Sequence, residues 1–189
     1  VTGAGTGEEQ GIQDKIDLYF STFAKSMASI GAFVSGDRDI LTYLRYNTRS
    51  QIFAKSLPLP IVIGNLKRLE LLRTKPELKA KLWENVNLLQ SGLRAKGFNL
   101  GITNSCVTPV QMSGTVEEAT ELVKDLRENF SIFCSVVIYP VVPKGTIILR
   151  LIPTAAHTKE DIDITIEAFG AISGKLAAGH YQKAAEAMI

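Results

Sequence analysis

The first residue whose type and setting could support covalent chemistry is Lys25. It is the one charged residue of the stretch YFSTFAKSMASIGAFVSG, residues 19–36, in which small and apolar side chains predominate. One interpretation is an ordinary lysine that extends into solvent, and composition alone favours it because lysines are mostly exposed. The other is a partly desolvated amine, which loses its proton more easily and can form a Schiff base. Thr22, three residues earlier in a predicted loop, could donate a hydrogen bond to a phosphate oxygen.

Arg150 is the second candidate. It interrupts TIILRLIP, residues 146–153, which otherwise resembles a strand buried on both faces. A guanidinium in such a strand needs a partner or an opening into a cleft. It could form a structural ion pair, or it could grip a substrate carboxylate through two parallel hydrogen bonds. The residues alone favour neither interpretation.

The remaining positions indicate no second chemistry. Cysteines and histidines lack metal-ligand spacing, and the N-terminal glycines lack the strand that precedes a dinucleotide fingerprint. These residues are Cys106, Cys134, His157, His180, Gly3, Gly5 and Gly7. His157 is interpreted as structural because it lies beside a predicted helix cap. A net charge of +2 without a basic stripe gives no reason to expect nucleic acid, and the apolar runs contain too many turn residues for stable membrane insertion. A reduced, cytoplasmic setting is expected.

The elements that must position these residues fall into two groups, with a boundary near Thr74. The first group is expected to contain two short strands and two helices, the first helix capped by Asp37. The second group is expected to begin with a capping box in Thr74 and Glu77 and to follow the order β–α–β–β–α after its first helix. Helices should cover one face of its small sheet. The expected ranges are strands at 16–20, 32–36, 108–114, 132–140 and 146–153, and helices at 37–46, 60–73, 74–97, 115–126 and 158–176, with a second capping box in Thr115 and Glu118 and a further cap at Thr158.

Three motifs, taken together, resemble the α-oxoamine synthases, which are pyridoxal-phosphate enzymes. STFAKSMASIGAFVSG is similar to the family's GTFSK or GTLGK ahead of a Gly-rich stretch, GAGTGEEQG to GRGTxEHFG, and VVPKGTIILRLIPTAAHT to VPKG…R…AAHT. The resemblance implies an α/β chain, the C-terminal half of the aspartate-aminotransferase type of fold. Residues 1–73 would be the end of the large cofactor-binding domain, and residues 74–189 the small α+β domain.

The resemblance also implies roles for individual residues. Lys25 would hold pyridoxal phosphate as a Schiff base and later move the substrate's α-proton. Thr22 would bind the cofactor phosphate, and Arg150 would hold the amino-acid carboxylate. Several family members have a serine that reaches the partner subunit's cofactor phosphate. Here that segment is FAKS, so Ala54 could offer only its backbone N–H.

The substrates implied are L-serine and a long-chain acyl-CoA, condensed with loss of CO₂ to a 3-oxo amine by a homodimer. KSMASIGAF is close to the KSFASLGGF of the serine palmitoyltransferase branch, and Ile148 and Leu149 precede Arg150 as aliphatic residues do in that branch. Glycine C-acetyltransferase, 8-amino-7-oxononanoate synthase and a non-catalytic subunit of the same fold are the alternatives. The family's Asp and His that contact the pyridine ring have no counterpart here, so residues 1–189 alone are expected to turn over no substrate.

Overall fold

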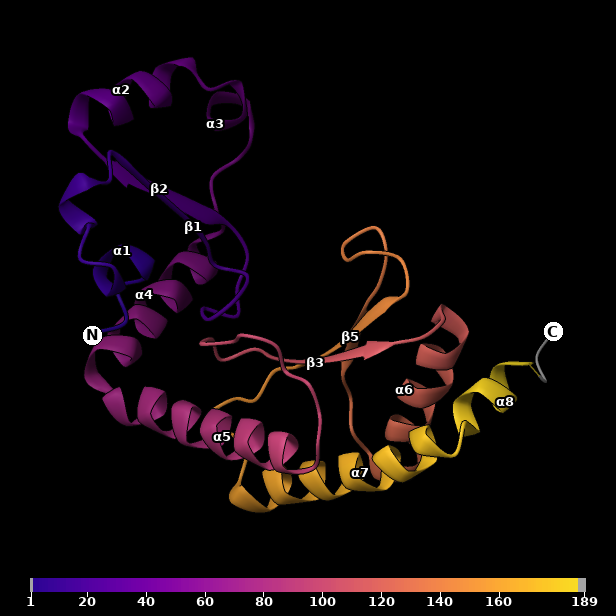
Figure 1. The fold of residues 1–189 in the computed structure, drawn as a ribbon. Coiled ribbons are helices and arrows are strands. Elements are labelled where there is room, and N and C mark those ends of the chain that lie inside the picture. The colour runs from indigo at the N-terminus through magenta and orange to yellow at the C-terminus, as the bar shows by residue number, and fades with distance from the viewer. Residues whose placement is uncertain (1, 187–189) are drawn as a thin grey trace. The chain divides into compact units, whose positions relative to one another are not determined.

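The computed structural model describes residues 2–186 and has the predicted α/β character. The chain divides into two compact units, Val1–Pro76 and Glu77–Ile189, and each is described by itself (Figure 1). The division follows Pro76, shortly after the boundary near Thr74 that the sequence predicts. The assignment of these units to a large and a small domain stays a prediction.

The first unit contains one two-stranded antiparallel sheet and several helices. Asp37 caps α2 as predicted, because its Oδ1 accepts a hydrogen bond of 2.8 Å from the backbone N–H of Asp39. The first strand begins at Leu18, two residues later than expected, after a short 3-10 helix that ends at Lys15. The elements are α1 (Thr6–Glu9), η1 (Gln13–Lys15), β1 (Leu18–Thr22), β2 (Ala32–Gly36), α2 (Arg38–Asn47), α3 (Arg49–Phe53) and α4 (Leu59–Thr74).

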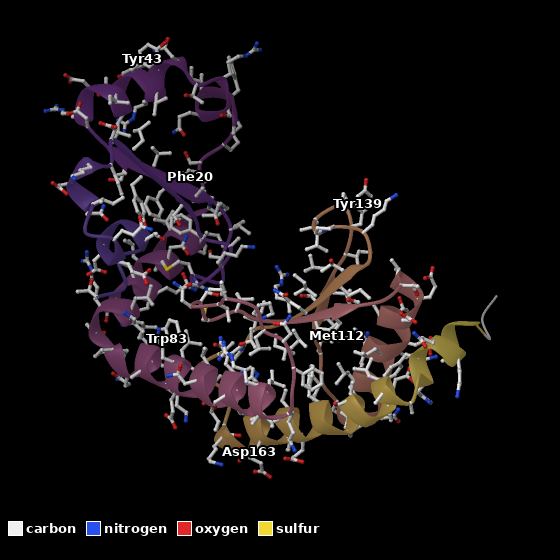
Figure 2. All side chains as sticks on the ribbon, viewed as in Figure 1. Phe20, Tyr43, Trp83, Met112, Tyr139 and Asp163 are labelled. Carbon is white, nitrogen blue, oxygen red and sulfur yellow. The ribbon has the colours of Figure 1, made fainter. Side chains whose placement is uncertain are left out.

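This first unit has no buried apolar core among its described residues. Only Gly7 and Asn65 are buried there. Large apolar side chains instead face solvent, including Phe20 at 64% and Tyr43 at 65% exposure, both labelled in Figure 2. Asn65 is buried without a hydrogen-bond partner for either its Oδ1 or its Nδ2. The unit therefore has apolar side chains that its own described residues do not cover.

The second unit is built around a three-stranded antiparallel sheet with the strand order β3-β5-β4. The predicted order of elements is confirmed, with one further short helix, α8, that the sequence analysis missed. The elements are α5 (Pro76–Ala95), β3 (Thr108–Ser113), α6 (Val116–Phe130), β4 (Ser135–Val137), β5 (Thr146–Leu151), α7 (Lys159–Ala177) and α8 (His180–Glu186).

Only one face of this sheet is buried, which corrects the prediction for β5. Ile147, Leu149 and Leu151 are buried, whereas Ile148 is half-buried and Arg150 is exposed. Successive side chains of a strand point to opposite faces, so the alternation leaves Arg150 on the open face. α5, α6 and α7 supply most of the rest of the core and lie on the buried face (Figure 1), and Leu100, Ile132, Cys134 and Tyr181 complete it. This core includes Leu93, Leu122, Leu126, Phe169 and Ile172.

The strand β4 is much shorter than the predicted range of 132–140. It pairs with β5 over Ser135–Val137 alone. Pro140 and Pro143 follow it, and neither has an N–H with which to extend the ladder.

One of the two predicted capping boxes is present, and the predicted cap at Thr158 is a capping box as well. Thr115 caps α6 with Glu118, and Thr158 caps α7 with Asp161. The box at Thr74 is wrong, because Thr74 is the last residue of α4 and its hydroxyl donates a 2.8 Å hydrogen bond to the carbonyl of Glu70.

The helices α5 and α7 meet closely at Gly92. A Cβ atom added there would lie 2.8 Å from Cγ1 and 3.1 Å from Cγ2 of Ile166. Glycine lets the buried Ile166 side chain rest directly on the backbone of α5.

Candidate active site

Lys25 lies in the loop that joins β1 to β2. The Phe23 N–H donates to the Gly31 carbonyl at the neck of this loop, and the Ser29 N–H donates to the Phe23 carbonyl, both at 2.9 Å. A third bond of 2.9 Å, from the Ala28 N–H to the Lys25 carbonyl, closes a tight turn that begins at Lys25. The loop is thus held by its own backbone, and Lys25 has a defined place at its far end.

The Lys25 side chain is exposed, as in the first of the two interpretations, and is not partly desolvated in this structure. The surrounding small residues are themselves largely exposed, and β2 is exposed along its whole length. Small side chains leave space around a lysine but shield little of it from solvent. Within residues 2–186, the Lys25 amine has neither a hydrogen bond nor an ion pair, so no described residue occupies it.

Thr22 is the last residue of β1 rather than part of the loop, and it pairs with Ala32. Its hydroxyl is exposed and forms no hydrogen bond with another described residue. A free primary amine and a free hydroxyl at the same end of one hairpin suit an aldehyde that carries a phosphate. The residues present therefore fit pyridoxal phosphate.

Ala54 follows α3, and its backbone N–H donates a 2.9 Å hydrogen bond to the Ser50 carbonyl. This N–H is the group that the sequence analysis assigned to the cofactor phosphate. It is already engaged in closing the last turn of the helix, as helix ends commonly require. In this structure the Ala54 N–H is thus engaged within its own helix end, and its contact with a cofactor phosphate stays a prediction.

Arg150 lies in the second unit, on the open face of the sheet. Its Nε donates a 3.1 Å hydrogen bond to the Ser135 hydroxyl. Within residues 2–186 Arg150 forms no ion pair, which argues against the structural ion-pair interpretation. The two terminal amino groups have no partner in the described chain, and their spacing suits the two oxygens of a carboxylate.

Ser135 is the residue that the sequence analysis missed. It lies directly across from Arg150 in the register of β4 and β5. The outward position of Arg150 could have been found from the alternation of buried residues in its strand. The register could not, because it depends on the connection between the two strands.

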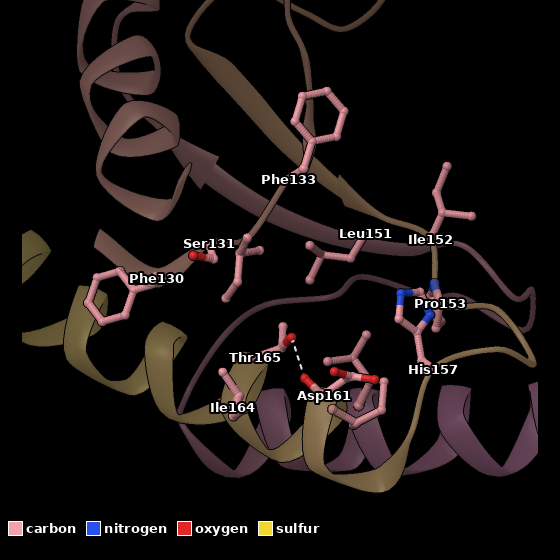
Figure 3. Close-up of a pocket in the computed structure, with 13 residues that line it drawn as sticks. Phe130, Ser131, Phe133, Leu151, Ile152, Pro153, His157, Asp161, Ile164 and Thr165 are labelled. Carbon is pink, nitrogen blue, oxygen red and sulfur yellow. Dashed lines mark hydrogen bonds between the residues drawn. The ribbon is translucent and has the colours of Figure 1, made fainter. Parts of the chain in front are cut away.

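A cavity of about 350 Å³ lies in the second unit, and none of the predicted site residues lines it. Figure 3 shows His157 and Asp161 at its wall beside apolar side chains such as Leu151 and Phe133. The Asp161 carboxylate accepts hydrogen bonds from the backbone and hydroxyl of Thr158, and these bonds hold its pKa below the usual range. The carboxylate of Asp161 therefore takes part in the capping box at the start of α7.

His157 has the structural role that the sequence predicts. Its Nδ1 accepts a 2.9 Å hydrogen bond from the Thr154 N–H. The carbonyls of both residues accept from Nδ2 of the buried Asn85, at 2.8 and 3.0 Å. These bonds tie the segment before α7 to α5. Among residues 2–186 there is no group of three or more His, Cys, Asp or Glu side chains that could hold a metal ion, and no helix suited to cross a membrane.

Several curated proteins are similar to this chain over most of its length. A cysteate-C-fatty acyltransferase of Capnocytophaga ochracea is 62% identical over 95% of the chain, which covers 43% of that protein. A serine palmitoyltransferase of Sphingobacterium spiritivorum is 38% identical, with 87% of the chain and 41% of that protein covered. An 8-amino-7-oxononanoate synthase of Thermoanaerobacter pseudethanolicus is 31% identical, with 93% and 44% covered. The chain thus spans less than half the length of these relatives.

Solved structures give the same picture. The chain matches a structure described as serine palmitoyltransferase with its pyridoxal-phosphate internal aldimine, with a TM-score of 0.85, 30% identity, and 94% of this chain and 44% of that one covered. A Sphingomonas wittichii serine palmitoyltransferase has a TM-score of 0.86 and 28% identity, with the same coverage. The predicted resemblance, fold class and family cofactor are confirmed. The family model for aminotransferase class I and II matches residues 2–169. The chain therefore belongs to the class I and II aminotransferase family of enzymes, and its relatives include acyltransferases of the α-oxoamine synthase type.

Proposed function

We propose that this chain is part of an enzyme that joins a fatty acyl group to the α-carbon of an amino acid. The bond from the α-carbon to the acyl carbonyl carbon forms, the thioester bond to CoA breaks, and the carboxyl group leaves as CO₂. The observation that supports this most is the free amine of Lys25 in a chain 62% identical to a cysteate-C-fatty acyltransferase.

Thr22, Lys25 and Arg150 each have a separate role in this proposed reaction. The Thr22 hydroxyl donates to the phosphate of the cofactor, and Lys25 Nζ binds its aldehyde carbon. When bound, pyridoxal phosphate supplies the electron sink for the carbanion formed at the α-carbon. Lys25 Nζ would also take the α-proton of the amino acid as general base. The terminal amino groups of Arg150 hold the substrate carboxylate and so fix which bond at the α-carbon can break.

The amino acid we propose first is cysteate, supported by the 62% identity to an enzyme named for it. L-Serine is the second candidate, supported by the KSMASIGAF motif and by the 38% identity to a serine palmitoyltransferase. We propose a long-chain acyl-CoA as the donor in both cases. We also propose a homodimer, because the apolar surface of the first unit suits burial against a second copy.

The test uses the complete natural protein loaded with pyridoxal phosphate. CoA release from palmitoyl-CoA is measured with cysteate, L-serine and glycine in turn. We expect turnover to be fastest with cysteate, absent in Lys25→Ala, and retained in Lys15→Ala, which alters an exposed lysine of the same unit.

A second measurement on the same samples identifies the lysine that binds the cofactor covalently. Borohydride reduction should attach the cofactor to Lys25, as found by mass spectrometry of the digested protein. Adduct on another lysine, or full turnover by Lys25→Ala, would remove the basis of the proposal. A preference for glycine with acetyl-CoA would instead move the protein to the glycine C-acetyltransferase branch.

A further inference from the structure

The hydrogen bond from Arg150 to Ser135 crosses between two strands on the open face of the sheet. The two residues are directly paired in the register of β4 and β5, and Ser135 is half-buried. Directly paired side chains on one face are close enough to interact. The 3.1 Å bond from Nε to the Ser135 hydroxyl is the one hydrogen bond that the Arg150 side chain forms within residues 2–186.

The other described neighbours of Arg150 form no hydrogen bond with it, and the polar one, Gln111 of β3 diagonally across the open face, instead accepts a 3.4 Å hydrogen bond from Asn99 Nδ2. On the opposite side the paired residue is Pro109, whose side chain has no hydrogen-bonding atom. The next pair of β4 and β5 on the same face of the sheet is Val137 with Ile148, and both side chains are apolar. Within residues 2–186, Ser135 is thus the neighbour whose side chain is hydrogen-bonded to the guanidinium.

Orientation matters because Arg150 is exposed and its side chain has several rotatable bonds. A guanidinium binds a carboxylate well only when its plane and two of its N–H groups meet both oxygens. A bond at Nε restrains the plane of the group and leaves the two terminal amino groups for the ligand. A preoriented arginine loses less rotamer freedom when the ligand arrives.

We propose that Ser135 is a positioning residue, which holds the Arg150 guanidinium so that its two terminal amino groups face the carboxylate of the amino-acid substrate. This inference rests on the proposed function, because it assumes that Arg150 binds that carboxylate. Ser135 itself does not touch the substrate.

The experiment measures amino-acid affinity in the complete protein loaded with pyridoxal phosphate, from the change in cofactor absorbance as cysteate or L-serine is added. Ser135→Ala should raise the dissociation constant by about three- to tenfold, as expected for one lost hydrogen bond. Turnover at saturating amino acid and the affinity for the cofactor should stay unchanged. Ser113→Ala, which removes an exposed serine from the far end of the same sheet, is the matched control.

A second pair of variants keeps the shape of the side chain constant. Ser135→Thr retains the hydroxyl and should restore the affinity, whereas Ser135→Val has nearly the same shape without the hydroxyl and should not. Equal affinities for these two variants would overturn the inference even if Ser135→Ala lowers stability.

A double-mutant cycle separates this inference from the proposed function. Arg150→Lys lacks an Nε donor, so adding Ser135→Ala to it should weaken binding no further. If the effects of the two substitutions are instead additive, or if Arg150→Lys weakens binding and Ser135→Ala does not, Ser135 is not a positioning residue. If Arg150→Lys binds the amino acid normally, the carboxylate role of Arg150 in the proposed function fails, and the positioning inference fails with it.

Discussion

The two units of this chain bury their apolar side chains to very different extents. Every buried hydrophobic residue among residues 2–186 lies in the second unit, Glu77–Ile189. The first unit buries only Gly7 and Asn65. Both units have regular secondary structure and capped helices, so the difference lies in tertiary packing.

This difference in burial applies to the proposed site residues, because the two units contain different ones. Arg150 and Ser135 lie on a sheet whose other face is packed on a core, so the second unit can hold their geometry by itself. Lys25 and Thr22 lie on a hairpin in the unit that lacks a core. The residue proposed for covalent chemistry thus lies in a unit that lacks the packing from which most helical and sheet stability comes.

The largest expected contrast comes from removing one phenylalanine from each unit. Phe169 is fully buried in the second unit and lies edge-on to Phe98 at 5.3 Å between ring centroids. Phe169→Ala should lower the free energy of unfolding by about 3–5 kcal/mol, because it leaves a cavity. Phe53 is 72% exposed in the first unit, and Phe53→Ala should change stability by less than about 0.5 kcal/mol.

Guanidinium unfolding of the chain, followed by the fluorescence of its single tryptophan, measures both effects. That tryptophan is Trp83, in α5 of the second unit. Similar losses from the two phenylalanine substitutions would contradict the contrast between the units.

A smaller effect is expected from Asp125, which joins α6 to α7 and α8. Its carboxylate accepts hydrogen bonds from Lys175 Nζ and the Tyr181 hydroxyl at 2.6 Å, and from Asn129 Nδ2 at 2.7 Å. Burial raises the pKa of Asp125, but these three hydrogen bonds outweigh burial and lower the pKa to about 2. Asp125→Asn should cost about 1–3 kcal/mol at pH 7, because it removes a charged acceptor.

The sign of the pH dependence follows from that lowered pKa. The folded chain binds a proton at Asp125 less readily than the unfolded chain does, so this contribution is complete above about pH 4. It amounts to about 2 kcal/mol and is lost as the pH falls toward 2. Urea unfolding at pH 2 to 5 should show this loss in the natural chain and in Asp14→Asn, which changes an exposed aspartate of the first unit. If Asp125→Asn keeps the same pH dependence, the carboxylate does not stabilise the second unit.

The smallest contrast concerns helix caps. Thr158 accepts from the Asp161 N–H at the start of α7, whereas Thr48 at the start of α3 in the first unit makes no such bond. Thr158→Ala should therefore cost about 1 kcal/mol and Thr48→Ala close to nothing. Thermal melting of both variants provides the comparison, and equal shifts would show that the cap geometry does not decide the effect.

The sequence correctly predicts the features that depend only on residues close together in the chain. The caps at Asp37, Thr115 and Thr158 are correct because a side chain and the N–H it binds lie within three residues. The motif around Lys25 is likewise a short segment, and its loop is closed by its own backbone.

The sequence fails to predict the features that distant segments decide. The pairing of Ser135 with Arg150 depends on the β4–β5 register, and the exposure of Lys25 depends on what packs over the hairpin. Thr74 was assigned to the wrong helix because its local sequence suits a cap, whereas α4 continues through it. The engaged N–H of Ala54 follows from α3 reaching Phe53, a helix that the sequence did not predict.

The contact between α5 and α7 at Gly92 has a consequence for anyone who wishes to engineer this protein. A table of helix propensities recommends alanine in the middle of a helix, at a gain of about 1 kcal/mol over glycine. Here the added methyl group would meet Ile166 at its branch point rather than at a flexible tip alone, so the buried side chain would have to move as a whole. A substitution scheme that ranks positions by local preference would therefore select the position in α5 where the substitution does harm.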